Sequence, residues 1–183
     1  MPRITPLNHP YADEIQGHFD RIMPPGAPPL LLFRTLATSE RAWRKFRSAS
    51  LLDRGPLSLR DREIVIDRVC ARAGCEYEWG VHVTAFAEAV KLTPAQIEAT
   101  VGGSADAPCW APNEAALIAA VDALHERAAL DDAEFGRLRA FYDEAQILEI
   151  LLLAGFYRTV AYIVGGLDLP LEPGAARFAA PAG

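Results

Sequence analysis

The segment Cys75-Glu-Tyr-Glu-Trp-Gly-Val-His82 holds three side chains that can transfer a proton or attack an electrophile. Cys75, Glu78 and His82 are three and four residues apart, which places them on one face of a helix. A carboxylate and an imidazole at this spacing can act as a proton-transfer pair. Cys75 lies near the predicted start of the helix, where free amides and the helix dipole lower the pKa of a thiol. The carboxylate of Glu78 acts in the opposite direction.

Glu63 is a second candidate acid, on the helix predicted before this segment. It lies on an apolar stripe, and glutamates are seldom fully buried unless another group pairs with them. If the two helices form a hairpin around Gly74, the side chain of Glu63 faces the partner helix near His82. A structural ion pair with Arg62 or Arg68 is the alternative explanation for an acid at this position.

Each candidate also has a structural interpretation. Cysteine is among the most commonly buried residues, so Cys75 could simply fill the core, and we interpret Cys70 and Cys109 in that way. A single histidine such as His82 is more often a hydrogen-bonded core residue, and a glutamate such as Glu78 is more often a surface or capping acid. The combination on one face, rather than any single residue, indicates a site.

Two aromatic residues, Tyr77 and Trp79, lie within the same segment. We expect them either to pack in the core or at an interface, or to contact a substrate bound near the polar side chains. The sulfur, nitrogen and oxygen atoms of the candidate residues differ in hardness, which fits a metal site poorly. The sequence therefore predicts a site with no metal and no cofactor.

Glycine, proline and capping residues divide the rest of the chain into segments of helical periodicity. The predicted N-caps are Ser58, Thr93, Asn113, Asp131 or Asp132, and Asp143 or Glu144. The predicted helices span residues 12–22, 30–36, 39–52, 58–72, 75–91, 93–102, 114–129, 133–142 and 143–164. Short loops between amphipathic helices favour antiparallel neighbours, so we predict an all-α helical bundle.

Composition divides the chain into three parts. Seven of the 14 prolines lie within the first 30 residues, so residues 1–29 are predicted to be a proline-rich arm with at most one short helix. Residues 30–170 form the predicted helical domain. Residues 171–183 are rich in proline, alanine and glycine and are predicted to be a flexible tail.

Charge and cysteine content limit the classes of partner. The net charge of −6 argues against a nucleic-acid partner, and we interpret Arg41, Arg44, Lys45 and Arg47 as a solvated helix face. The N-terminal sequence does not resemble a secretory signal, and charged residues within residues 147–164 disfavour a membrane span. Three cysteines without an export signal indicate reduced thiols, so we expect a cytoplasmic protein.

Residues 57–63, 75–83 and 92–97 resemble the carboxymuconolactone decarboxylase-like superfamily, which includes the alkylhydroperoxidase-D-like (AhpD-like) proteins. The specific part of the resemblance is the arrangement Glu-x11-Cys-x2-[Cys or Glu]-x3-His, and the resemblance as a whole covers about residues 30–170. It implies an all-α fold with the motif helix at a subunit interface. It also implies a homo-oligomer (a dimer, trimer or hexamer) and a small-molecule substrate.

The superfamily has two branches that differ at this motif. The peroxidase branch has Cys-x2-Cys-x3-His and a remote glutamate, which correspond here to Cys75, His82 and Glu63. Glu78 stands where the second, peroxide-attacking cysteine should be, and Tyr77 stands where that branch has a further histidine. No CxxC dithiol can form in this chain, so the two-thiol peroxidase cycle lacks one partner.

The lactone decarboxylase branch resembles this chain at the Glu-x3-His pair, Glu78 and His82. We therefore expect cofactor-independent acid–base chemistry on a small organic acid or lactone, with Glu63 orienting His82 and Cys75 as a polar or nucleophilic contributor. One alternative is a thiol-dependent hydroperoxide reductase that uses Cys75, with Cys70 or an external thiol as its partner. The other alternative is a non-catalytic helical oligomer that binds a small ligand.

Overall fold

The structure of the protein is a computed structural model that describes residues 2–179. These residues form helices and no strand, which confirms the predicted all-α class. The helices are α1 (Asp13–Ile22), α2 (Leu31–Leu36), α3 (Glu40–Ser48), α4 (Leu59–Arg72), α5 (Glu76–Phe86), α6 (Pro94–Gly102), α7 (Pro112–Arg127), α8 (Asp132–Arg139) and α9 (Glu144–Leu167).

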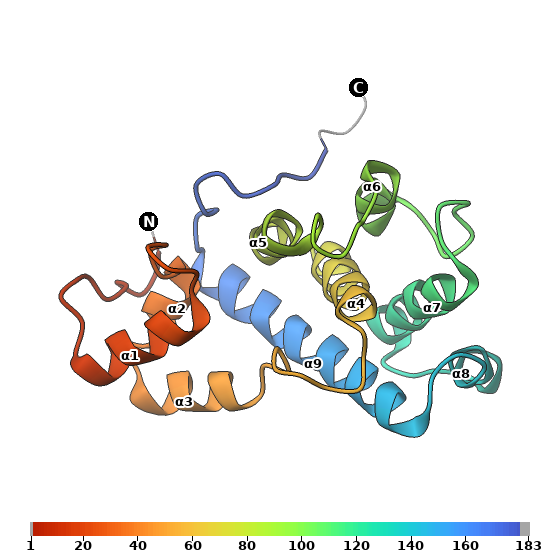
Figure 1. Ribbon diagram of the computed structural model, residues 1–183, viewed down its shortest axis with the longest axis horizontal. Helices are drawn as coiled ribbons and strands as arrows, with labels where there is room; N and C mark the ends of the chain where they lie inside the picture. Colours follow the sequence, from red (N-terminus) through yellow and green to blue (C-terminus); the bar gives the residue numbers. More distant parts are fainter. Residues whose placement is uncertain (1, 180–183) are drawn as a thin grey trace.

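Helix α4 is the centre of the bundle. It packs against α5, α7 and α9, and its residues from Glu63 to Cys70 are all buried. Figure 1 shows α1, α2 and α3 together on one side of the long helix α9, with α4 and the helices α5 to α8 on the other side. Side chains that lie between α4 and α5 are therefore inside the protein and not at its surface.

The turn between α4 and α5 is a Schellman motif. Gly74 has a φ of +66°, a conformation that glycine adopts without steric cost. The amide of Cys75 donates to the carbonyl of Cys70 at 2.8 Å, and the amide of Gly74 donates to that of Ala71 at 3.0 Å. This closed turn folds α5 back against α4, which confirms the predicted hairpin.

Most of the predicted N-caps are confirmed. Ser58, Thr93, Asp131 and Asp143 each accept a hydrogen bond from an amide in the first turn of their helices. Asn113 was wrongly predicted as a cap. Its helix begins one residue earlier, at Pro112, because proline suits the first helical position, where no amide donor is needed.

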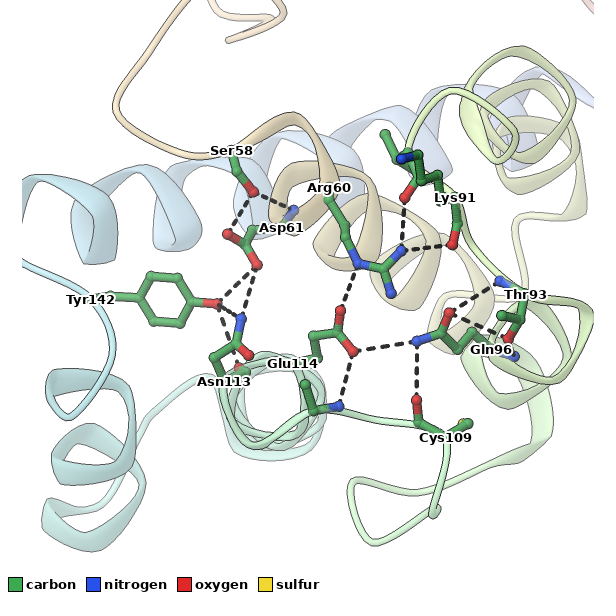
Figure 2. Close-up of polar contacts among 12 residues, drawn as sticks. Ser58, Arg60, Asp61, Lys91, Thr93, Gln96, Cys109, Asn113, Glu114 and Tyr142 are labelled. Atoms are coloured by element: carbon green, nitrogen blue, oxygen red, sulfur yellow. Dashed lines mark hydrogen bonds and ion pairs between the residues drawn. The ribbon is translucent and has the colours of Figure 1, made fainter.

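The side chain of Asn113 instead joins a polar network between α4, α7 and the segment before α9 (Figure 2). Its amide lies 3.3 Å from the hydroxyl of Tyr142, which in turn donates to Asp61 at 3.0 Å. In the same region, Arg60 bonds Glu114 at 2.6 Å (Figure 2). These bonds fix the first turn of α4, directly before Glu63.

Helices α5 and α9 end differently from the prediction. Helix α5 ends at Phe86 and is followed by turns, not by further helix to residue 91. Helix α9 continues to Leu167. By length and composition α9 could cross a membrane, so the charged residues within it do not exclude a span as the sequence argument supposed. One face of α9 is buried against α4 and α5, whereas Leu148, Leu152 and Tyr162 are exposed.

The tail predicted to be flexible, residues 171–183, lies against α5 in the part that the structure describes. The ring of Phe178 packs on that of Trp79 with centroids 5.0 Å apart. The amide of Ala176 donates to the hydroxyl of Thr84 at 2.8 Å. An aromatic residue and free backbone amides hold this segment in place despite its proline and glycine content. The rest of the tail lies outside the described residues.

Candidate active site

Three of the predicted site residues meet between α4 and α5. Nδ1 of His82 lies 2.7 Å from Oε2 of Glu63, and Nε2 lies 3.5 Å from Oε1 of Glu78. The side chains are 1% (Glu63), 4% (His82) and 7% (Glu78) exposed. The predicted placement of Glu63 beside His82 is confirmed. The predicted alternative also holds in part, since Arg62 bonds the other oxygen of Glu63 at 3.3 Å.

The two carboxylates determine the charge of His82. Burial lowers the pKa of the imidazole, but the hydrogen bonds and charges of Glu63 and Glu78 outweigh it and raise the pKa to about 10. His82 is therefore an imidazolium at neutral pH. Asp67, one turn after Glu63, is buried as well, and burial raises its pKa well above its usual range. Burial thus favours the uncharged form of Asp67 beside this ion cluster.

Aromatic rings enclose the imidazolium. The ring of Tyr157 from α9 meets that of His82 edge-on, with centroids 5.1 Å apart, and the ring of Phe86 lies 5.4 Å away. These rings place apolar groups beside the imidazolium, and a low dielectric strengthens the interaction between the charges of the ion cluster.

Glu78 and His82 form part of the wall of a cavity of about 970 Å³. Helices α1 and α3 form the opposite wall, Phe156 and Tyr157 of α9 contribute its floor, and the segment 172–175 borders it. The second oxygen of Glu78, Oε2, is buried and has no hydrogen-bond partner among the described residues. A carboxylate oxygen is thus free to accept a proton from a ligand in the cavity.

Cys75 is the N-cap of α5 and does not line the cavity. The expectation that the helix N-terminus lowers its pKa is wrong. Burial is the largest effect, and with the charge of Glu78 it outweighs a backbone hydrogen bond and raises the pKa to about 11. Burial also raises the pKa of Cys70 well above its usual range. Both thiols are therefore protonated at neutral pH.

Tyr77 and Trp79 are not among the residues that line the cavity, and their contact with a substrate stays a prediction. The hydroxyl of Tyr77 donates to Glu172 and accepts from the amide of Leu32. Nε1 of Trp79 donates to the hydroxyl of Thr100 at 2.9 Å. The two aromatic residues thus tie α5 to its neighbours. Within residues 2–179, no group of three or more His, Cys, Asp or Glu side chains is arranged to hold a metal ion.

Residues 37–123 match the model of the Carboxymuconolactone decarboxylase family. The matched segment contains Glu63, Cys75, Glu78 and His82, and so covers the whole ion cluster. Over this part of the chain the protein is similar to that family. No curated protein sequence matches the chain.

Solved structures share the fold of this protein at low sequence identity. An uncharacterized peroxidase-related protein from Silicibacter sp. TM1040 has a TM-score of 0.83 and 17% identity, over 97% of this chain and 96% of that chain. An alkylhydroperoxidase AhpD core from Ralstonia eutropha JMP134 has a TM-score of 0.82 and 16% identity, over 94% of this chain and 93% of that chain. The debrominase Bmp8 has a TM-score of 0.76 and 16% identity, over 93% of this chain and 92% of that chain.

The sequence alone did not indicate several residues that shape the site. Tyr157 lies on the apolar stripe of α9, where its sequence environment looks like ordinary core. Arg47 belongs to a basic cluster that was interpreted as a solvated face. Glu172 was assigned to the flexible tail, although an isolated acid within a Pro- and Gly-rich segment is itself a signal of a specific contact.

Proposed function

We propose that this protein is a cofactor-independent enzyme that transfers a proton at a carbon atom of a small organic acid or lactone, with decarboxylation or isomerisation as the outcome. The observation that carries the proposal is that Glu78, a residue of the cavity wall beside the imidazolium of His82, has an oxygen, Oε2, without a hydrogen-bond partner among the described residues. Glu63 and Glu78 are both buried and both contact His82, an arrangement that supports an acid–base role.

The roles divide as follows. Oε2 of Glu78 takes a proton from a carbon next to a carbonyl, and the electron pair of the C–H bond moves into the carbonyl to give an enolate. The positive charge of His82 offsets the negative charge that develops on the substrate oxygen. Return of the proton to another carbon isomerises the substrate. In a decarboxylation, cleavage of the C–C bond releases carbon dioxide and leaves the same enolate, which is then protonated on carbon. Glu63 acts as a positioning residue.

A thiol-dependent hydroperoxide reductase is the second candidate, since two of the structural neighbours are described as peroxidase-related. A Cys-to-Ala variant of the debrominase Bmp8 is in complex with 2,3,4-tribromopyrrole. In this chain, however, Cys75 is away from the cavity wall and its raised pKa keeps it protonated. The geometry therefore supports the acid–base proposal over the redox one.

Deuterium exchange tests the proposal without knowledge of the natural substrate. Acetoacetate, muconolactone and 4-carboxymuconolactone are incubated in D2O, and deuterium on carbon is followed by NMR. We expect the protein to accelerate exchange or carbon dioxide release for at least one probe, and Glu78→Gln to reduce that rate about a hundredfold or more. Glu88→Gln, an exposed glutamate that follows the same helix, should keep the full rate. Full activity in a folded Glu78→Gln protein would rule out the assignment.

A further inference from the structure

The cavity has a second charged region, away from Glu78 and His82. Arg21 of α1 and Arg44 and Arg47 of α3 contribute to its wall. The guanidinium of Arg47 lies over the ring of Trp43, with Cζ 5.6 Å from the centroid. Its Nε is buried without a hydrogen-bond partner, and within residues 2–179 the group pairs with no carboxylate. A buried donor without a partner indicates a missing acceptor.

Aromatic rings connect the two charged regions. The ring centroids of Trp43 and Phe46 are 6.3 Å apart, and Phe46 lies 5.2 Å from Phe156. Phe156 lies 5.4 Å from Tyr157, which lies 5.1 Å from His82. The two polar ends are therefore separated by a continuous apolar wall. This arrangement fits an elongated ligand with an apolar body.

The protein itself leaves the region around Arg47 positive. Glu172, the other acid on the cavity, already accepts hydrogen bonds from the hydroxyl of Tyr77 and the amide of Leu31. Burial and the charges of Arg47 and Arg21 lower the pKa of His18, which supports a positive potential at this end. The complement to such a region is an anion, and guanidinium binds carboxylates with two parallel hydrogen bonds.

We propose that Arg47 is the specificity-determining residue of the cavity. Its guanidinium binds the carboxylate of an amphiphilic acid, and the apolar body of that acid lies along the aromatic wall. The reacting carbon then lies at the opposite end, beside Glu78. This orientation rests on the proposed function, whereas the selection of acids over neutral compounds rests only on Arg47 and the wall. The residue acts on binding and not on the chemical step.

Calorimetric titration with a matched pair of probes tests the proposal. The probes are 4-phenylbutyrate and its uncharged amide, 4-phenylbutyramide, which share one apolar body. We expect the wild-type protein to bind the acid about tenfold or more tightly than the amide. Arg47→Met should remove most of this preference and leave the amide affinity unchanged. Arg41→Met, an exposed arginine of α3 outside the cavity wall, should keep the preference.

Equal affinity of the wild-type protein for the two probes, or no binding of either, would overturn the proposal even if Arg47→Met failed to fold. A preference that survives in a folded Arg47→Met protein would overturn it as well. Glu78→Gln separates this proposal from the proposed function, since it should abolish deuterium exchange and keep the preference for the acid. A preference for the acid in a protein that exchanges no probe would leave the role of Arg47 standing and refute the acid–base function.

Discussion

Glu63 and His82 lie on different helices, and a hydrogen bond of 2.7 Å joins Oε2 of the acid to Nδ1 of the imidazole. Because Glu78 approaches the other ring nitrogen at 3.5 Å, the imidazolium lies between two carboxylates. The ring can neither rotate nor lose its proton easily. His82 therefore contributes a fixed positive charge, and the acid with a free oxygen, Glu78, is the group able to exchange protons with a ligand.

Replacement of Glu63 by glutamine should lower the pKa of His82, because an amide removes the negative charge that now stabilises the imidazolium. NMR of the His82 ring over pH 6 to 11 measures this pKa directly. The alkaline limb of the exchange rate should move to lower pH in parallel. Glu98→Gln, at an exposed position of α6, is the control. An unchanged His82 pKa in Glu63→Gln would contradict the positioning role.

The stability of the fold should fall as pH rises. The pKa of His82 is about 10 in the folded protein, whereas a histidine in the unfolded chain has its ordinary pKa of 6.5. Between these two pH values the folded state therefore holds one more proton than the unfolded state. Its contribution is complete below pH 6.5 and is lost as pH rises through 10. The difference in unfolding free energy between wild type and His82→Gln should shrink by up to about 1.4 kcal/mol per pH unit in this window. Urea titrations between pH 7 and 9 measure it, and a constant difference would refute the charged state assigned to His82.

Cys75 should react slowly with alkylating agents in the native protein. Its pKa of about 11 leaves little thiolate at pH 7.5, and burial restricts access. Iodoacetamide should modify Cys75 roughly a hundredfold more slowly than in urea, whereas the half-buried Cys109 should react first. Peptide mass mapping distinguishes the two sites. Rapid oxidation of Cys75 by cumene hydroperoxide, or loss of deuterium exchange in Cys75→Ala, would favour the redox alternative instead.

An alanine at Gly80 should displace the segment that lies over α5. A Cβ at this position would overlap the carbonyl oxygen of Ala176. We expect faster hydrogen exchange at the Ala176 amide and faster proteolysis after Arg177 in Gly80→Ala. Gly155→Ala provides the matched control, since Gly155 lies within α9 with open space around it. Equal protection of the segment in both variants would show that its contact with α5 is not tight.

Local signals in the sequence predicted the hairpin and the ion cluster correctly. Gly74 between two helical patterns marks a turn, and the position of Glu63 then follows from the rise per residue of a helix. Ser58 and Thr93 marked helix starts, because capping depends on a few neighbouring residues only. Such features depend on contacts that are close in sequence or related by a single turn.

Features that depend on distant segments were not predictable in this way. The pKa of Cys75 depends on how deeply the fold buries it, and this burial outweighs the local effect of the helix N-terminus. Only the positions of α5 and α9 in the fold show that Arg47 borders the cavity, which the basic pattern of its own helix does not indicate. The contacts of Glu172 with Tyr77 and Leu31 join parts of the chain that no pattern relates.

The wall of the cavity extends in sequence from His18 to Ala175, whereas the family match ends at residue 123. The ion cluster lies entirely within the matched segment, but Phe156, Tyr157 and the segment 172–175 do not. Arg47 also lies within the matched segment, whereas the part of the apolar wall that α9 and the segment 172–175 contribute falls outside it and can diverge independently of the ion cluster. Two homologues with an identical Glu-x3-His helix can process unrelated compounds, and grafting that helix into another scaffold would transfer the reactive groups without the ligand preference.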